Sequence, residues 1–174
     1  MQIIDNFLPQ DFADQVLKEL NSADFPWYLN QYTSYKRDNE PQLVHNFYNG
    51  QPQSAWFLHI SPVLEVFESK TEYKINSIGR IKANLLTNRV APKDYIEKTI
   101  HQDTDKDNYI SLLYYVDDAD GDTILYQGDK VTEAMRITPK RNRAVIFKSN
   151  IWHTGLLPVE ASIRRVINFI VEVK

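Results

Sequence analysis

Two histidines and one aspartate have the residue types and the spacing of a metal site. His101 and Asp103 are separated by one residue, and His153 follows 50 residues after the aspartate. Because alternate residues of a β-strand point to the same side, the imidazole and the carboxylate would converge, with Gln102 turned away. Two imidazoles and one carboxylate suit non-haem Fe(II) and leave coordination positions open. The sequence therefore predicts an iron site at these three residues, with both imidazoles neutral.

The same segment allows less specific interpretations. A His-x-Asp tripeptide often arises by chance. Asp103, Asp105 and Asp107 also match the first, third and fifth positions of a calcium-binding loop. However, the sixth position is Asn108 instead of glycine, and the twelfth is Tyr114 instead of glutamate. The calcium interpretation is therefore disfavoured.

The other two histidines of the chain are weaker candidates for ligands. His59 lies in the apolar stretch Trp56–Ile60 and is expected to be a packed histidine. His45 lies in a polar stretch and is expected to be a loop residue; the alternative is that it contacts a substrate.

A pair of arginines follows the second candidate histidine. Arg164 and Arg165 precede the apolar run Val166–Val171, and Arg164 comes eleven residues after His153. A cation at the start of a buried strand is costly unless it is paired, and the arginine fork fits a carboxylate. A dicarboxylate could bind the metal at one end and an arginine at the other. Strand alternation lets only one of the two point inward, and the alternative is that both lie on the surface.

The composition limits the other classes of site. The chain has 174 residues and no cysteine, so a metal must be held by histidine, aspartate or glutamate. The formal net charge of −3 gives no strong nucleic-acid signature, although a site for a single strand or a flipped base stays open. There is no signal-peptide pattern and no long apolar run, so we expect a cytoplasmic protein without a membrane segment. The sequence gives no oligomeric state.

The pattern of the chain changes near residue 71. Residues 1–70 predict a helix after Pro9, a polar loop over about 31–54, and a second short helix that begins at Pro62. Residues 71–174 predict short strands separated by turns. The predicted strands are 73–86, 109–116, 123–126, 130–137, 144–147, 151–157 and 163–173. We expect a single domain over 1–174 of the α+β class, mainly β: a double-stranded β-helix (jelly roll) with the N-terminal helices packed on one sheet.

The segment from about Ser77 to Val171 resembles the Fe(II)- and 2-oxoglutarate-dependent dioxygenases, in particular their small prolyl-hydroxylase-like branch. The resemblance rests on the order and spacing of several short motifs, and the opening residues 4–9 also look like the first strand and helix entry of this branch. The motifs are His101-x-Asp103, the runs 111–117, 120–123 and 144–147, His153-x-Gly155 and the run 164–169.

The resemblance implies a role for each matching residue. His101, Asp103 and His153 would bind iron, and Arg164, in preference to Arg165, would pair with the distal carboxylate of 2-oxoglutarate. Further pocket residues would be Tyr115, which in some relatives contacts that carboxylate, together with Leu113, Asn84 and Asn168. Tyr115 could equally be an aromatic core residue. Where relatives often have a tyrosine in the strand of Asn84, this chain has Leu85 and Leu86, so the contacts of the inner carboxylate stay open.

The resemblance also implies the reaction. The chain would use Fe(II), 2-oxoglutarate and dioxygen, with ascorbate as a supporting reductant, to hydroxylate an unactivated C–H bond with release of succinate and carbon dioxide. The expected substrate is a prolyl or other side chain of a protein or peptide. The alternatives are a free amino acid, another small metabolite or a nucleobase. A different class, a noncatalytic jelly-roll binding module, would be expected to lack one of the four residues His101, Asp103, His153 and Arg164.

Overall fold

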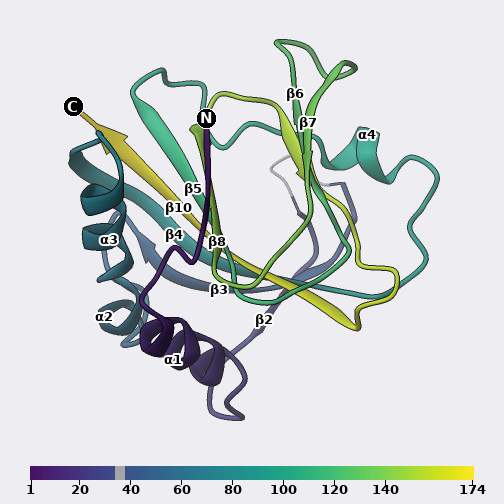
Figure 1. Cartoon of the computed structure of the whole chain (residues 1–174). Helices are drawn as coiled ribbons and strands as arrows, with labels where there is room; N and C mark the ends of the chain where they lie inside the picture. Colours follow the sequence, from purple (N-terminus) through teal and green to yellow (C-terminus); the bar gives the residue numbers. More distant parts are fainter. Residues whose placement is uncertain (34–37) are drawn as a thin grey trace.

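The computed structural model describes residues 1–33 and 38–174, and its strands form two antiparallel sheets (Figure 1). The large sheet has the order β1-β8-β5-β10-β4-β3-β2. Its strands are β1 (Gln2–Asp5), β2 (Tyr28–Asn30), β3 (Gln42–Asn49), β4 (Ile75–Thr87), β5 (Tyr109–Tyr115), β8 (Arg143–Lys148) and β10 (Ile163–Val173). The small sheet has the order β7-β6-β9, with β6 (Thr123–Tyr126), β7 (Glu133–Ile137) and β9 (His153–Gly155).

Three helices cover one face of the large sheet, and the small sheet lies on the other side (Figure 1). The helices are α1 (Gln10–Leu20), α2 (Phe57–Ile60) and α3 (Val63–Lys70), whereas α4 (Tyr95–Thr99) follows β4. In α1, the buried residues Ala13, Val16 and Leu20 recur at helical spacing, so one apolar stripe meets the sheet. The predicted double-stranded β-helix with N-terminal helices on one sheet is confirmed.

The central strand β10 separates two environments. Ile167 and Phe169 belong to the core beneath the helices, whereas Val166 belongs to the core between the two sheets. This alternation follows from the period of two in a strand. Of the neighbours of β10 in the sheet, β4 pairs Asn84 with Val166 and Lys82 with Asn168. Alternate residues of both strands therefore face the space between the sheets.

The predicted boundaries agree with the structure at β6 and β10 and differ elsewhere. The expected polar loop over 31–54 is wrong for residues 42–49, which form β3 and pair with β4; residues 34–37 of that loop lie outside the described residues. Residues 1–70 thus supply three strands as well as helices. Of the predicted strand 151–157, only β9 forms, and β7 begins at Glu133 instead of residue 130.

Two histidines differ from their predicted environments. His45 is 1% exposed on β3, where its ring nitrogens bond to the Pro26 carbonyl and the Ser54 hydroxyl, both at 2.8 Å. The prediction of a loop residue is therefore wrong, and its ring is buried in the structure. His59 lies exposed on α2 and pairs with Glu19 at 2.8 Å, so the prediction of a packed histidine is also wrong.

Candidate metal and dicarboxylate site

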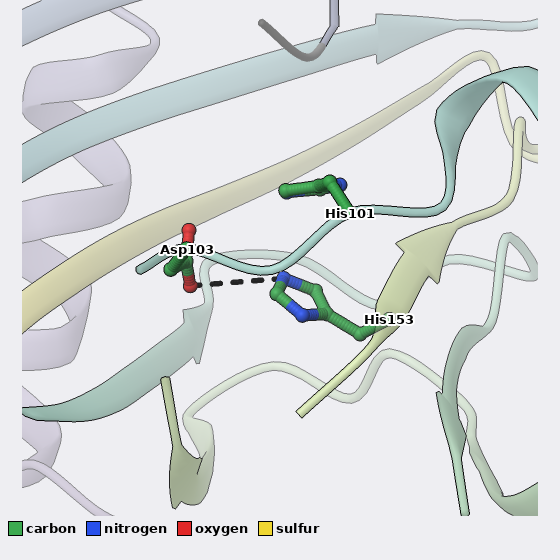
Figure 2. A group of neighbouring side chains, drawn as sticks. All are labelled: His101, Asp103 and His153. Carbon is green, nitrogen blue, oxygen red and sulfur yellow. Dashed lines mark ion pairs between the residues drawn. The ribbon is translucent and has the colours of Figure 1, made fainter. Parts of the chain in front are cut away.

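The structure brings His101, Asp103 and His153 together between the ends of the two sheets (Figure 2). One potential ligand atom from each residue lies within 4.8 Å of the others. His101 and His153 form an isolated antiparallel bridge, with backbone hydrogen bonds of 2.9 and 2.8 Å in the two directions. The expected regular strand through residues 101–103 is not formed, because the chain bends at Asp103 directly after the bridge. The carboxylate and the imidazole of His153 still approach to 3.6 Å.

Backbone carbonyls orient both imidazole rings. Nδ1 of His101 lies 2.9 Å from the Thr99 carbonyl, and Nδ1 of His153 lies 2.9 Å from the Ile151 carbonyl. A carbonyl can only accept, so each Nδ1 carries the proton in these contacts. In a neutral imidazole with this hydrogen bond, Nε2 is the unprotonated nitrogen and can bind a metal.

The Asp103 carboxylate is fully covered and held by three side chains. Asn168 donates to both of its oxygens at 3.0 and 3.2 Å, Ser111 donates to Oδ2 at 2.6 Å, and Arg80 donates to Oδ1 at 3.1 Å. Hydrogen bonds to an ionised acceptor are among the strongest in proteins. The carboxylate is thus fixed in orientation and anionic.

The electrostatics favour the charge states that a divalent cation requires. Burial and, to a smaller extent, the neighbouring His153 lower the pKa of His101 to about 4. Burial alone would raise the pKa of Asp103, but His153, His101, Arg80 and the Ser111 hydroxyl outweigh burial and lower it to about 2. At neutral pH the site therefore presents a neutral His101 imidazole and a carboxylate.

The three residues adjoin a cavity between the two sheets, and Arg164 lines the same cavity. Most of the lining residues have polar or charged side chains. The lining residues are Asn30, Thr33, Gln42, Arg80, Lys82, Asn84, Leu86, Tyr95, Thr99, His101, Leu113, Thr123, His153, Thr154, Gly155, Arg164, Val166 and Asn168.

Arg164 is a buried cation without an acidic partner in the described part of the chain. Its Nε donates to the Gly121 carbonyl at 2.5 Å, and Nη2 donates to the Thr123 hydroxyl at 2.7 Å. No carboxylate of residues 1–33 or 38–174 lies within ion-pair distance of its guanidinium. A Cβ on Gly155 would lie 3.1 Å from Nη1, so the missing side chain makes room for the guanidinium. The free side of this fork is suited to a carboxylate.

Arg165 points to the other face of the sheet. It pairs with Asp117 through two contacts of 2.6 and 2.7 Å and also bonds to Asn21 at 2.6 Å. Its cationic charge is therefore already neutralised beside α1. Of the two arginines that the sequence left open, only Arg164 faces the cavity.

The remaining predicted pocket residues divide into two groups. Asn84, Leu113 and Asn168 line the cavity, although Asn168 directs its amide nitrogen at Asp103. Tyr115 is 0% exposed, is absent from the lining, and donates its hydroxyl to Thr123 at 2.7 Å. Because Thr123 also receives the Arg164 bond, Tyr115 supports the arginine from behind in this arrangement.

Sequence reasoning missed two cations of the cavity, Arg80 and Lys82. Both precede Asn84 on β4 at intervals of two, and all three line the cavity. The period of two in a strand would have found them once Asn84 was placed inward. Tyr95, Thr123 and Thr154 were missed as well, and no chemical signal in the sequence marks them.

The residues present fit a divalent iron and a dicarboxylate. Two imidazoles and a carboxylate form the donor set, and Arg164 offers an anion site in the same cavity. The amide oxygens of Asn84 and Asn168 are also buried and accept no hydrogen bond from the described residues. Such orphaned polar atoms beside a cavity are typical of a site that binds a polar ligand.

Comparisons with known proteins agree with this site. The model of the 2OG-Fe(II) oxygenase superfamily matches residues 90–172, which contain all three candidate ligands and Arg164. No curated protein matches the chain by sequence. The match to the 2OG-Fe(II) oxygenase superfamily thus spans the part of the chain that holds the candidate site, and the prediction of a non-haem Fe(II)- and 2-oxoglutarate-dependent dioxygenase is confirmed as the enzyme class.

Solved structures share the fold at low sequence identity. A Pseudomonas putida prolyl-4-hydroxylase is 15% identical with a TM-score of 0.65, and the match covers 99% of this chain and 92% of that one. A 2OG-Fe(II) oxygenase family protein from Burkholderia pseudomallei is 13% identical with a TM-score of 0.68, over 98% and 84%. The viral collagen prolyl hydroxylase of Paramecium Bursaria Chlorella virus-1, in its 2OG complex, is 15% identical with a TM-score of 0.56, over 99% and 96%. In the described part of this chain, no helix is long and apolar enough to cross a membrane.

Proposed function

We propose that the chain hydroxylates an unactivated C–H bond of a protein or peptide side chain, with proline as the first candidate. His101, Asp103 and His153 hold Fe(II), and Arg164 binds the distal carboxylate of 2-oxoglutarate. The observation that carries this proposal is that the three ligand atoms lie within 4.8 Å of one another, beside a cavity lined by the Arg164 guanidinium, which has no acidic partner among the described residues. The residues 1–174 act as a single catalytic domain.

When bound, Fe(II) with 2-oxoglutarate and dioxygen supplies the oxidation, and succinate and carbon dioxide leave. The residues of the chain position the reactants. Backbone carbonyls fix both imidazoles, and Ser111 and Asn168 fix the carboxylate. Thr123 holds the guanidinium of Arg164 in place for the cosubstrate. Val166 and Leu113, between these two ends, give the cavity apolar surface that limits water.

The choice of a prolyl side chain is supported by the resemblance of the chain and by fold neighbours whose names include prolyl hydroxylases. A free amino acid, another small metabolite or a nucleobase is the alternative substrate class. The two classes of substrate differ in size. Because a peptide is larger than a free metabolite, it must also contact the rim of the cavity. Asn30 and Thr33 at that rim belong to the segment around β2, whose Leu29 is 70% exposed.

The test is in two stages on the full chain. First, Mn(II) binding is followed by electron paramagnetic resonance, and 2-oxoglutarate binding to the Mn(II)-loaded protein by calorimetry. Then Fe(II), ascorbate and dioxygen are supplied with proline peptides, matched alanine peptides and free amino acids, and succinate and oxygen incorporation are measured. We expect binding in the first stage and coupled turnover with one substrate set in the second.

Asp103→Ala is the critical variant, with the exposed Asp105→Ala as its matched control. Asp103→Ala should lose metal binding and turnover, while Asp105→Ala retains both. Turnover by Asp103→Ala equal to that of the wild type would refute the ligand assignment.

A further inference from the structure

The cavity contains more positive charge than the proposed cosubstrate neutralises. Three cationic side chains among the described residues line it: Arg80, Lys82 and Arg164. Asp103, which lies behind the lining, is the acidic partner in this region, and Arg80 already binds it at 3.1 Å. Asp38 and Glu40 are buried nearby but do not line the cavity, and Glu40 pairs with Arg89 at 2.6 Å.

Lys82 is the least compensated of these cations. Its side chain is partly buried and lines the cavity, and no hydrogen bond or ion pair joins its ammonium to the described residues. Burial and, to a smaller extent, the neighbouring positive charge of Arg80 lower the pKa of Lys82 to about 8. A buried ammonium without a partner is costly, so such a group is retained in a cavity where a ligand pairs with it.

The position of Lys82 separates it from the Arg164 end. Along β4, Leu86 is paired with Arg164, Asn84 with Val166, and Lys82 with Asn168, the residue that holds Asp103. With a strand rise of about 3.3 Å per residue, the offset of four residues from position 82 to position 86 corresponds to roughly 13 Å along the backbone. Lys82 and Arg164 therefore extend from different ends of the cavity lining. Lys82 therefore faces the region beside the metal ligands.

The charge balance indicates what binds there. A divalent cation adds two positive charges to the cavity, and 2-oxoglutarate removes two. The cationic side chains still outnumber the single carboxylate of Asp103 after both have bound. The remaining positive charge includes the Lys82 ammonium, because the cosubstrate neutralises Arg164 and Arg80 is paired with Asp103.

We propose that Lys82, next to Arg80, binds an anionic oxygen group of the primary substrate, so that the substrate class is molecules with a carboxylate or a phosphate close to the oxidised carbon. This inference rests on the proposed function and narrows it. A free amino acid or a peptide with an acidic group near the target meets the requirement. A peptide that is neutral around the target would leave the ammonium buried and unpaired.

The experiment uses inorganic phosphate and acetate as probes of the full chain loaded with Mn(II) and saturating 2-oxoglutarate. Bound Mn(II) broadens the phosphorus resonance of phosphate and the methyl proton resonance of acetate when either binds near the metal. The variants are Lys82→Met, the charge-retaining Lys82→Arg, and Lys18→Met, which removes the same charge from the exposed face of α1. Lys82→Met should fold, because it replaces a buried unpaired cation with an apolar chain of similar length.

We expect both probes to bind the loaded wild type, Lys82→Arg and Lys18→Met. Their affinity for Lys82→Met should be lower by a factor of about ten or more. The affinity of Lys82→Met for 2-oxoglutarate should be unchanged. Equal probe binding by wild type and Lys82→Met would overturn the inference, since the anion would then bind elsewhere, such as on the metal.

A second result would also overturn it. If Lys82→Met weakens 2-oxoglutarate binding and the loaded wild type binds neither probe, Lys82 serves the inner carboxylate of the cosubstrate. Failure of the proposed function is distinguishable, because it would appear earlier as a wild type that does not bind Mn(II) and 2-oxoglutarate together. The inference would then fall with it.

Discussion

Asn168 donates its amide nitrogen to both carboxylate oxygens of Asp103, at 3.0 and 3.2 Å. The sequence suggested Asn168 as a contact of the cosubstrate, whereas the structure uses it to orient a candidate metal ligand. The amide lies on β10 and the aspartate on the segment after α4, so this contact joins the large sheet to the metal centre.

Replacement of Asn168 by alanine should weaken metal binding. Partners of metal ligands typically contribute about tenfold to a hundredfold in affinity, and we expect a loss in this range. The measurement is a Mn(II) titration followed by electron paramagnetic resonance. The exposed Asn49→Ala on β3 is the control and should bind as the wild type does. An unchanged affinity in Asn168→Ala would show that Ser111 and Arg80 suffice to hold Asp103.

The two adjacent arginines should separate binding from stability. Arg164→Ala removes the guanidinium that faces the cavity, and the affinity for 2-oxoglutarate should fall about a hundredfold with little change in Mn(II) affinity. Arg165→Ala breaks the buried pair with Asp117, so the free energy of unfolding should fall by about 3 kcal/mol while 2-oxoglutarate still binds. Calorimetry and urea unfolding measure the two effects. The opposite assignment of effects would identify Arg165 as the anchor.

Gly155→Ala should act on the cosubstrate through Arg164. The added Cβ would lie 3.1 to 3.3 Å from three atoms of the guanidinium, which must therefore shift. Overpacking of this kind costs about 1–3 kcal/mol, so the affinity for 2-oxoglutarate should fall about fivefold or more. Gly128→Ala is the control, because no atom lies within 4 Å of the added Cβ. Its φ of +54° makes the alanine strained, so this variant shows the effect of local backbone strain alone. Wild-type affinity in Gly155→Ala would mean that the guanidinium has room to move without loss.

The metal-free protein should lose stability in weak acid because of His101. Its pKa is about 4 in the folded chain and near 6.5 when unfolded, so the unfolded chain binds more protons between these values. The contribution of neutral His101 to the free energy of unfolding is complete above about pH 6.5. It is lost as the pH falls towards 4, and the free energy of unfolding then decreases by up to about 3 kcal/mol. Urea unfolding between pH 7 and pH 4 measures this change.

The matched variant for this pH dependence is His101→Gln, which does not titrate. It should flatten the profile over the same interval. A profile with the same slope in both proteins would assign the dependence to other groups.

The strands with nearly continuous apolar runs could be predicted from the sequence, and those stabilised by their neighbours could not. β6 and β10 were predicted with their observed bounds, because their apolar residues are flanked by turn residues. β3 contains Gln42, Asn46 and Asn49, which resemble loop residues, and it forms because β4 pairs with it. The pairing of distant segments is not encoded in local propensity.

The site shows the same division. The sequence motifs predicted residues that the fold brings together. Whether each side chain reaches the cavity or is buried beneath its lining depends on tertiary packing, which the motifs do not show. Tyr115 shares a strand face with Leu113, yet it lies beneath Thr123 and Arg164 and does not reach the cavity. His59 faces outward because Trp56–Ile60 turns as a short helix, in which the apolar residues do not enclose the imidazole.

The paired backbone hydrogen bonds between His101 and His153 tie two distant parts of the chain together independently of any ion. An ion that enters does not have to gather its ligands from separated loops, so little of its binding energy is spent on ordering the main chain. First-row divalent metals of similar size should therefore exchange in and out of the folded protein without unfolding it. Which ion occupies the protein in a cell then depends on the supply of each metal more than on the shape of the fold.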